Sequence, residues 1–237
     1  MTQAQQVIAK MKELGGFATF GQLNAAMDYS RWKSKTPEAS VRRIVQDNPA
    51  FFKIKPGLWA LEEQKPEVLS KLNIATVADA QKEDFSHSYY QGLAVEVGNY
   101  KDQSTYVPNQ DKNRLFVGKP LSSVSSLNDI EPFAYPELLR YAKTVDVVWF
   151  NERRMPSAFI EIEHSTDILN SLTKFYELQD FNASFQIVAD EYRESKFHDV
   201  INRTIFDDIR QRVEFVSYEK LASIHALSSQ LALTNKA

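Results

Sequence analysis

The sequence predicts a mixed α/β domain preceded by a small helical domain that ends in a β-hairpin. From about residue 86 onward, segments with strand character alternate with segments of helical periodicity, which favours a sheet with helices on its faces. Two neighbouring strands stand out, the apolar run VDVVWF at 145–150 and SAFIEIEHS at 157–165. The first 63 residues have a different texture, with three short helical segments before an alternating stretch.

Composition excludes several classes of protein. The chain has 237 residues, 43% of them hydrophobic and 25% charged, which is ample for a packed globular core. The sequence contains no cysteine, which excludes disulfides and thiolate zinc sites and fits a cytoplasmic location. The four histidines are scattered, so a histidine-rich metal site is not expected. No apolar run reaches the roughly 20 residues of a membrane helix, and we expect no membrane association.

Charge is distributed unevenly along the chain. Residues 1–65 contain ten Lys or Arg and six Asp or Glu, a net charge of +4. Since the whole chain has a net charge of −3, the remaining residues carry −7. A basic small domain joined to a more acidic domain is typical of a nucleic-acid reader attached to a carboxylate-containing site.

The N-terminal domain, expected over residues 1–63, is predicted to hold three helices followed by a hairpin. The first helix covers 4–14 and is stopped by Gly15-Gly16, and the second covers 20–27. Thr36 and Pro37 are typical of a helix start, and this third helix is expected to end near Pro49. The stretch FFKIKPGLWAL at 51–61 alternates around Pro56-Gly57, as in a hairpin.

Residues Phe17, Ala18 and Thr19, the helix TPEASVRRIV and the hairpin FFKIKPGLWAL resemble the HARE type of winged helix-turn-helix. The resemblance implies a third helix that enters the major groove of double-stranded DNA and a wing near the phosphates, with a hint of modified-base recognition. The DNA-binding residues that it implies are Ser40, Arg42, Arg43, Lys53 and Lys55. The alternative is a small helical domain that packs against a protein partner.

Residues 64–85 are polar with sparse apolar positions, and we expect a partly helical linker. The third segment, 86–237, is expected to form the larger domain, and its stretch 105–130 reads mainly as loop. The other elements predicted there are helices at 87–100, 136–145, 167–181 and 195–211, strands at 145–150, 157–165, 183–190 and 212–218, and a last helix from about 219. Thr166 or Asp167 is expected to cap the helix that follows the second strand.

Two carboxylates share one face of a strongly apolar strand. Alternation puts Phe159, Glu161 and Glu163 on one face of the strand, with the isoleucines on the other. Like charges at this spacing repel, and burial makes both harder to ionise, whereas a bound cation would favour the charged forms. Asp146 starts the preceding strand, and a short turn between the strands would bring it close to Glu161.

This arrangement resembles the core of the PD-(D/E)XK nuclease superfamily, the restriction endonuclease-like fold. The resemblance implies that Asp146 and Glu161 bind Mg²⁺, for which Mn²⁺ is an expected substitute. Glu163 stands where most members have Lys, giving an E-x-E variant, and Lys174 on the following helix is the candidate for the absent ammonium group. Glu96, on the helix preceding the sheet, corresponds loosely to an acidic residue that many members place beside the metal.

These features predict a Mg²⁺-dependent DNA endonuclease of restriction type. Its reaction would be phosphodiester hydrolysis, in which Glu163 and Lys174 orient the attacking water and the metal neutralises developing charge. Cutting both strands requires two sites, so a homodimer is expected. Two alternatives stay open: a nuclease-like DNA-binding regulator that lost catalysis with its lysine, and an α/β module that does not bind nucleic acid.

Overall fold

The computed structural model describes residues 1–164 and 167–235, and the chain divides into two compact units. Unit 1 consists of Met1–Lys82 together with the C-terminal segment from Ala222, and unit 2 consists of Glu83–Leu221. Among the described residues, no helix combines the length and apolar character needed to cross a membrane.

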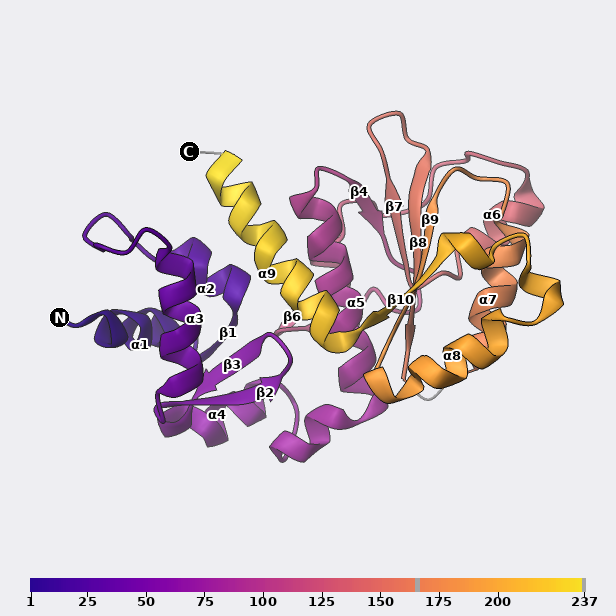
Figure 1. Ribbon diagram of the computed structural model, residues 1–237. Helices are drawn as coiled ribbons and strands as arrows, with labels where there is room; N and C mark the ends of the chain where they lie inside the picture. The colour runs from indigo at the N-terminus through magenta and orange to yellow at the C-terminus, as the bar shows by residue number, and fades with distance from the viewer. Residues whose placement is uncertain (165–166, 236–237) are drawn as a thin grey trace. The chain divides into compact units, whose positions relative to one another are not determined.

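The first 61 residues of unit 1 form three helices and a small antiparallel sheet (Figure 1). Its strands lie in the order β1-β3-β2, with β1 and β2 each antiparallel to β3. The elements are α1 (Gln3–Glu13), β1 (Phe17–Thr19), α2 (Phe20–Ala26), α3 (Pro37–Asp47), β2 (Phe51–Lys55) and β3 (Leu58–Leu61). The predicted helices and hairpin are therefore confirmed, while β1 was not predicted because three residues are too few to show alternation.

Local signals account for the helix starts in unit 1. Thr2 and Thr19 each form a capping box, in which the threonine side chain accepts from the backbone of the third helical residue. Thr36 occupies the corresponding position of α3, but its side chain makes no capping hydrogen bond, so Pro37 supplies the start signal. Gly57 adopts a positive φ of 82° in the hairpin turn, a conformation that glycine accommodates without strain.

Residues 64–82 pack into unit 1 instead of forming a free linker. They contain α4 (Lys65–Lys71) and a 3-10 helix, Val77–Gln81. Val68 and Ala80 are fully buried. Because such apolar residues are few in an otherwise polar segment, composition alone did not predict that the segment packs into unit 1.

The C-terminal part of α9 (Tyr218–Asn235) completes the core of unit 1. Ala226 is 5% exposed and belongs to the apolar cluster that includes Leu23 and Val41. A Cβ atom added to Gly21 would lie 3.0 Å from His225 Cε1, so α2 and α9 approach closely at this glycine. The core of unit 1 therefore combines residues from both ends of the chain.

Unit 2 is built on a mixed five-stranded sheet in the order β10-β9-β8-β7-β4. The pairs β4–β7 and β7–β8 are antiparallel, whereas β8–β9 and β9–β10 are parallel. The elements are α5 (Glu83–Tyr100), β4 (Ser104–Tyr106), β5 (Leu115–Phe116), β6 (Lys119–Pro120), α6 (Pro136–Ala142), β7 (Val147–Phe150), β8 (Pro156–Glu163), α7 (Ile168–Glu177), β9 (Ser184–Ala189), α8 (Glu194–Ile201) and β10 (Val213–Ser217). The predicted mixed α/β character is confirmed.

Helices cover both faces of this sheet (Figure 1). On one face, residues of α6, α7 and α8 share an apolar core with alternate strand residues such as Val148, Phe159 and Phe185. On the other face lies α5, where Trp149 Nε1 donates to the carbonyl of Ala94 at 3.1 Å. Because both faces of the sheet are covered, β8 is buried along nearly its whole length, including Glu161 and Glu163.

Two segments of unit 2 differ from the sequence prediction. The expected loop at 105–130 contributes the edge strand β4 and the short β5–β6 hairpin, whose strands are too short to leave a periodic signal. The helix expected at 195–211 ends at Ile201, where Arg210 donates to the carbonyls of Ile201 and Asn202. These bonds satisfy carbonyl groups at the end of α8 that would otherwise lack a partner.

Candidate functional site

Asp146 lies directly before β7 and is held from two sides. Its Oδ2 atom accepts a hydrogen bond from the backbone N–H of Ile162 in β8 at 2.7 Å. The same oxygen lies 3.2 Å from Nε2 of His87, which projects from α5. Asp146 is thereby fixed at the point where the first strand begins beside the second.

Glu161 and Glu163 are both 3% exposed and point toward α7. Lys174 Nζ donates to both carboxylate oxygens of Glu161 at 2.9 Å and to the carbonyl of Thr144 at 3.1 Å. Ser171, three residues earlier and on the same side of the helix, lies with its Oγ 3.0 Å from Glu161 Oε2 and in contact with Glu163 Oε1. The sequence placed Lys174 on this helix, and the structure brings it to Glu161.

Burial and the negative charge of Asp146 raise the pKa of Glu161 to about 8, against the opposing effects of Lys174 and Ser171. Without a metal, Glu161 therefore retains a proton near neutral pH. Ser171 lies between the two carboxylates, and its single hydroxyl proton is donated to one of them at a time.

Two residues of α5 that the sequence analysis did not select complete the surroundings of Asp146. Gln91 is fully buried, and its Nε2 donates to the Asp146 carbonyl at 2.8 Å and to Asp111 Oδ2 at 3.1 Å. Burial lowers the pKa of His87, but its hydrogen bond to Asp146 and the charges of Asp146 and Asp111 outweigh burial and raise it. His87 and Gln91 stand four residues apart, a spacing that puts both on one face of a helix and could have identified them.

Glu96 does not join this group. It lies on α5 nine residues after His87, which corresponds to about 13 Å along the helix axis. Its negative charge contributes to the raised pKa of Tyr89 and of Tyr100, where burial is the main cause. The residues of α5 that contact Asp146 are His87 and Gln91.

The carboxylates suit a hard divalent cation. Within the described ranges, no group of three His, Asp or Glu side chains is arranged to hold a metal. Asp146 and Glu161 supply oxygen donors from neighbouring strands, and Mg²⁺ commonly uses one or two carboxylates and fills its remaining positions with water and phosphate oxygens. Burial is the main cause of the raised pKa of Glu161 and repulsion from Asp146 the second, and a cation between the two carboxylates would relieve that repulsion. The donor set therefore fits Mg²⁺, provided that Lys174 releases part of its contact with Glu161.

The residues expected to bind DNA occupy different environments in unit 1. Arg43 and Lys53 are exposed, whereas the guanidinium of Arg42 lies 5.2 Å from the centre of the Phe20 ring. Ser40 Oγ donates to Ser34 Oγ at 3.1 Å.

Lys55 corrects the prediction. It is 1% exposed, and its Nζ donates to Gln81 Oε1 at 2.8 Å, so it is not a surface group of the hairpin. The irregular register between Lys53 and Lys55 turns Lys55 inward, which alternation alone could not predict.

Comparison with known proteins identifies relatives of the larger part of the chain. Residues 68–237 match the family described as Type II restriction enzyme NmeDI C-terminal domain. The type II restriction enzyme NmeDI of Neisseria meningitidis serogroup C is 29% identical over 102 residues, which cover 40% of this chain and 28% of that enzyme. The match thus spans less than a third of the relative's length. No solved structure matches the chain.

Proposed function

Because the chain belongs to the family of the Type II restriction enzyme NmeDI C-terminal domain, we propose that it is a restriction endonuclease that hydrolyses phosphodiester bonds in double-stranded DNA. The observation that carries this proposal is the convergence of Asp146, Glu161, Glu163 and Lys174 where β7 and β8 meet α7. Helix α5, the β4–β7–β8 meander, α7 and parallel β9 follow the order expected of the PD-(D/E)XK core.

The proposed roles follow from the contacts. Asp146 and Glu161 would hold Mg²⁺, or Mn²⁺ in its place, and the ion would activate a water and neutralise charge that develops on the phosphate. Glu163, buried beside Ser171, would accept a hydrogen bond from the attacking water. Lys174 would supply the ammonium group that the position of Glu163 lacks, because its Nζ already lies within 2.9 Å of Glu161. His87 and Gln91 would keep Asp146 in place.

Unit 1 is proposed to bind the DNA as a winged helix-turn-helix of HARE type. Its element order, with α3 followed by the β2–β3 hairpin, supports this reading. Arg43 on α3 and Lys53 on the hairpin are exposed and would contact phosphates. We also propose a homodimer for double-strand cleavage.

The test is a cleavage assay with the purified full chain. Methylated and unmethylated plasmids are incubated with Mg²⁺, with Mn²⁺ and with excess EDTA. The proposal predicts linear or fragmented plasmid with either metal and none with EDTA, and a difference between the plasmids would reveal dependence on base modification. Intact plasmid under every condition would contradict it.

One contact favours the alternative of a DNA-binding regulator without catalysis. Lys174 occupies both oxygens of Glu161, an arrangement that stabilises the site without metal. A protein that binds DNA with no metal-dependent cutting, and whose affinity does not respond to Mg²⁺ or Mn²⁺, would support this alternative.

A further inference from the structure

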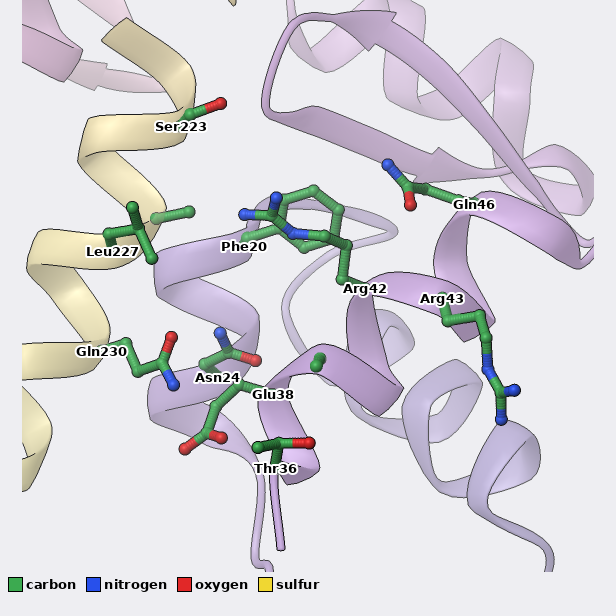
Figure 2. A pocket seen from close by; sticks show the side chains of 12 residues that line it. Phe20, Asn24, Thr36, Glu38, Arg42, Arg43, Gln46, Ser223, Leu227 and Gln230 are labelled. Carbon is green, nitrogen blue, oxygen red and sulfur yellow. The ribbon is translucent and has the colours of Figure 1, made fainter. Parts of the chain in front are cut away.

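A groove of about 350 Å³ lies on the surface of unit 1, between α3 and the C-terminal part of α9. Its walls come from α3 and from the C-terminal part of α9, and α2 contributes its floor (Figure 2). Its volume is at the lower end of the roughly 300–1,000 Å³ that is usual for sites binding small molecules. The residues of the metal site do not line it, and of the proposed phosphate contacts only Arg43 does.

Three polar side chains of the groove, Gln46, Gln230 and Glu38, make no hydrogen bond within the described part of the chain. Gln46 of α3 and Gln230 of α9 lie at opposite ends of the groove, with Phe20, Arg42 and Asn24 between them (Figure 2). Neither side-chain amide forms a hydrogen bond within the described part of the chain. The Glu38 carboxylate likewise forms no hydrogen bond or ion pair there. The carboxylates of the candidate metal site differ in this respect, because Glu161 accepts from Lys174 and both Glu161 and Glu163 contact Ser171. Donors and acceptors on opposite walls are thus available to one ligand.

The floor combines an aromatic ring with a buried amide. Phe20 is 8% exposed and carries the Arg42 guanidinium over its face, which gives a flat cationic and aromatic surface. Asn24 is 6% exposed, and its Oδ1 accepts from Tyr29 at 2.8 Å. The amide NH₂ of Asn24 has no hydrogen-bond partner among the described residues. A ligand that reaches the floor would meet this donor beside a stacking surface.

These features match a nucleobase. Asn and Gln amides, Arg and Glu are the side chains that pair with base edges, and a base stacks on aromatic and guanidinium planes. The major groove of DNA is about 12 Å wide and admits one helix of about 10–12 Å diameter, so α3 and α9 cannot enter it together. A base within the duplex stack therefore cannot reach Phe20 and Asn24.

We propose that the groove between α3 and α9 binds one unstacked nucleobase, positioned by Gln46 and Gln230. The inference rests on the proposal that unit 1 binds DNA, and it assigns the C-terminal helix a direct part in recognition. A base leaves the stack most easily where its pair is weak, and this dependence would add selectivity to the contacts of α3.

The test compares single-stranded oligonucleotides of equal length by fluorescence anisotropy with the full chain. The probes are the four homopolymers and an abasic strand that carries the same phosphates. We expect at least one homopolymer to bind about tenfold more tightly than the abasic strand, within the range that stacking of one base provides. Gln46→Ala combined with Gln230→Ala should bring this ratio close to one. Both positions are outside the core, so the double variant should fold.

Lys53→Ala is the matched control, because it should weaken all probes equally by removing a phosphate contact. Asp146→Asn should leave the ratio unchanged and lose only cleavage. Equal binding of homopolymers and abasic strand, with sensitivity to Lys53→Ala, would overturn the inference while DNA binding by unit 1 stands. The absence of binding to any strand would overturn both, and the plasmid assay would still test the nuclease site separately.

Discussion

At the residue scale, the proton held by Glu161 would compete with a bound metal for the same oxygens. Its pKa of about 8 in the fold lies above the usual value of 4.5, so the folded protein binds this proton more tightly than the unfolded chain does. The contribution of Glu161 to stability in the absence of metal should therefore fall as pH rises from about 4.5 to 8. A divalent cation would reverse the trend by replacing the proton.

We therefore predict that Mn²⁺ affinity increases with pH. One proton released per ion bound corresponds to about a tenfold decrease in Kd per pH unit below the pKa, and a plateau above about 8. Isothermal titration calorimetry between pH 6 and 9 measures this slope. Glu161→Gln should weaken binding and remove the dependence. An affinity that stays constant from pH 6 to 8 would show that Glu161 does not titrate against the metal.

The pair Glu163 and Lys174 decides whether the E-x-E variant is an active site. Lys174→Ala should lower the cleavage rate at least tenfold, about 1.4 kcal/mol of barrier, because it removes the cation beside Glu161. Glu163→Lys should also lower the rate, since it puts a second cation next to the bound metal. Both are measured in one plasmid assay with a circular dichroism check of folding. An inert wild-type protein that Glu163→Lys makes active would identify a degenerate nuclease.

At the element scale, the β5–β6 hairpin packs against helix α5 at Gly92. A Cβ atom there would lie 2.1 Å from Cγ of Phe116, which is itself buried. Helix propensity alone predicts that Gly92→Ala stabilises by about 1 kcal/mol. We predict the opposite, a destabilisation of about 1–3 kcal/mol, because the ring cannot move without displacing the hairpin. Urea unfolding gives the sign, and a stabilised variant would contradict this packing.

Most helices and turns could be predicted because residues at their ends determine them locally. The elements that the sequence did not predict are short and depend on pairing with distant segments. The helix starts at Thr2 and Thr19 and the turn at Gly57 depend on neighbouring residues, so sequence patterns reveal them. Thr166 lies outside the described residues, while Asp167 caps α7 by accepting from Leu169 N at 3.0 Å. Strand β4, in contrast, exists because it pairs with β7, and three residues carry no information about that pairing.

The same distinction holds for the candidate site. Asp146, Glu161 and Lys174 could be selected because they match the pattern of the PD-(D/E)XK core that the sequence resembles. Ser171 could not, since the role of a serine within a helix depends on partners that are distant in sequence. For Gln91 the sequence offers only its four-residue spacing from His87, and its contact with Asp146 becomes visible in the structure. The burial of Lys55 depends on the bulge in β2 and on Gln81, which neither alternation nor charge indicates.

At the scale of the whole molecule, unit 1 should contribute affinity for DNA through charge. We predict that Arg42→Ala combined with Arg43→Ala weakens binding to a duplex fragment and reduces the dependence on salt, by about 1 in the logarithmic slope for each phosphate that is no longer neutralised. Lys10→Ala combined with Lys12→Ala on α1 removes the same charge elsewhere on unit 1 and should have a smaller effect. Equal effects of the two pairs would remove α3 from the interface.

The most direct measurement is the plasmid cleavage rate of Asp146→Asn and Glu161→Gln in Mg²⁺, beside the wild-type protein and the control Asp129→Asn. Asp129 carries an exposed carboxylate, 61% accessible, that contacts Lys143 and the backbone of Ile130. The nuclease assignment predicts that both site variants fold and lose cleavage, because each removes a carboxylate ligand, while the control cuts at the wild-type rate. If Asp146→Asn and Glu161→Gln cut as fast as the wild-type protein, the carboxylates of β7 and β8 do not form the active site.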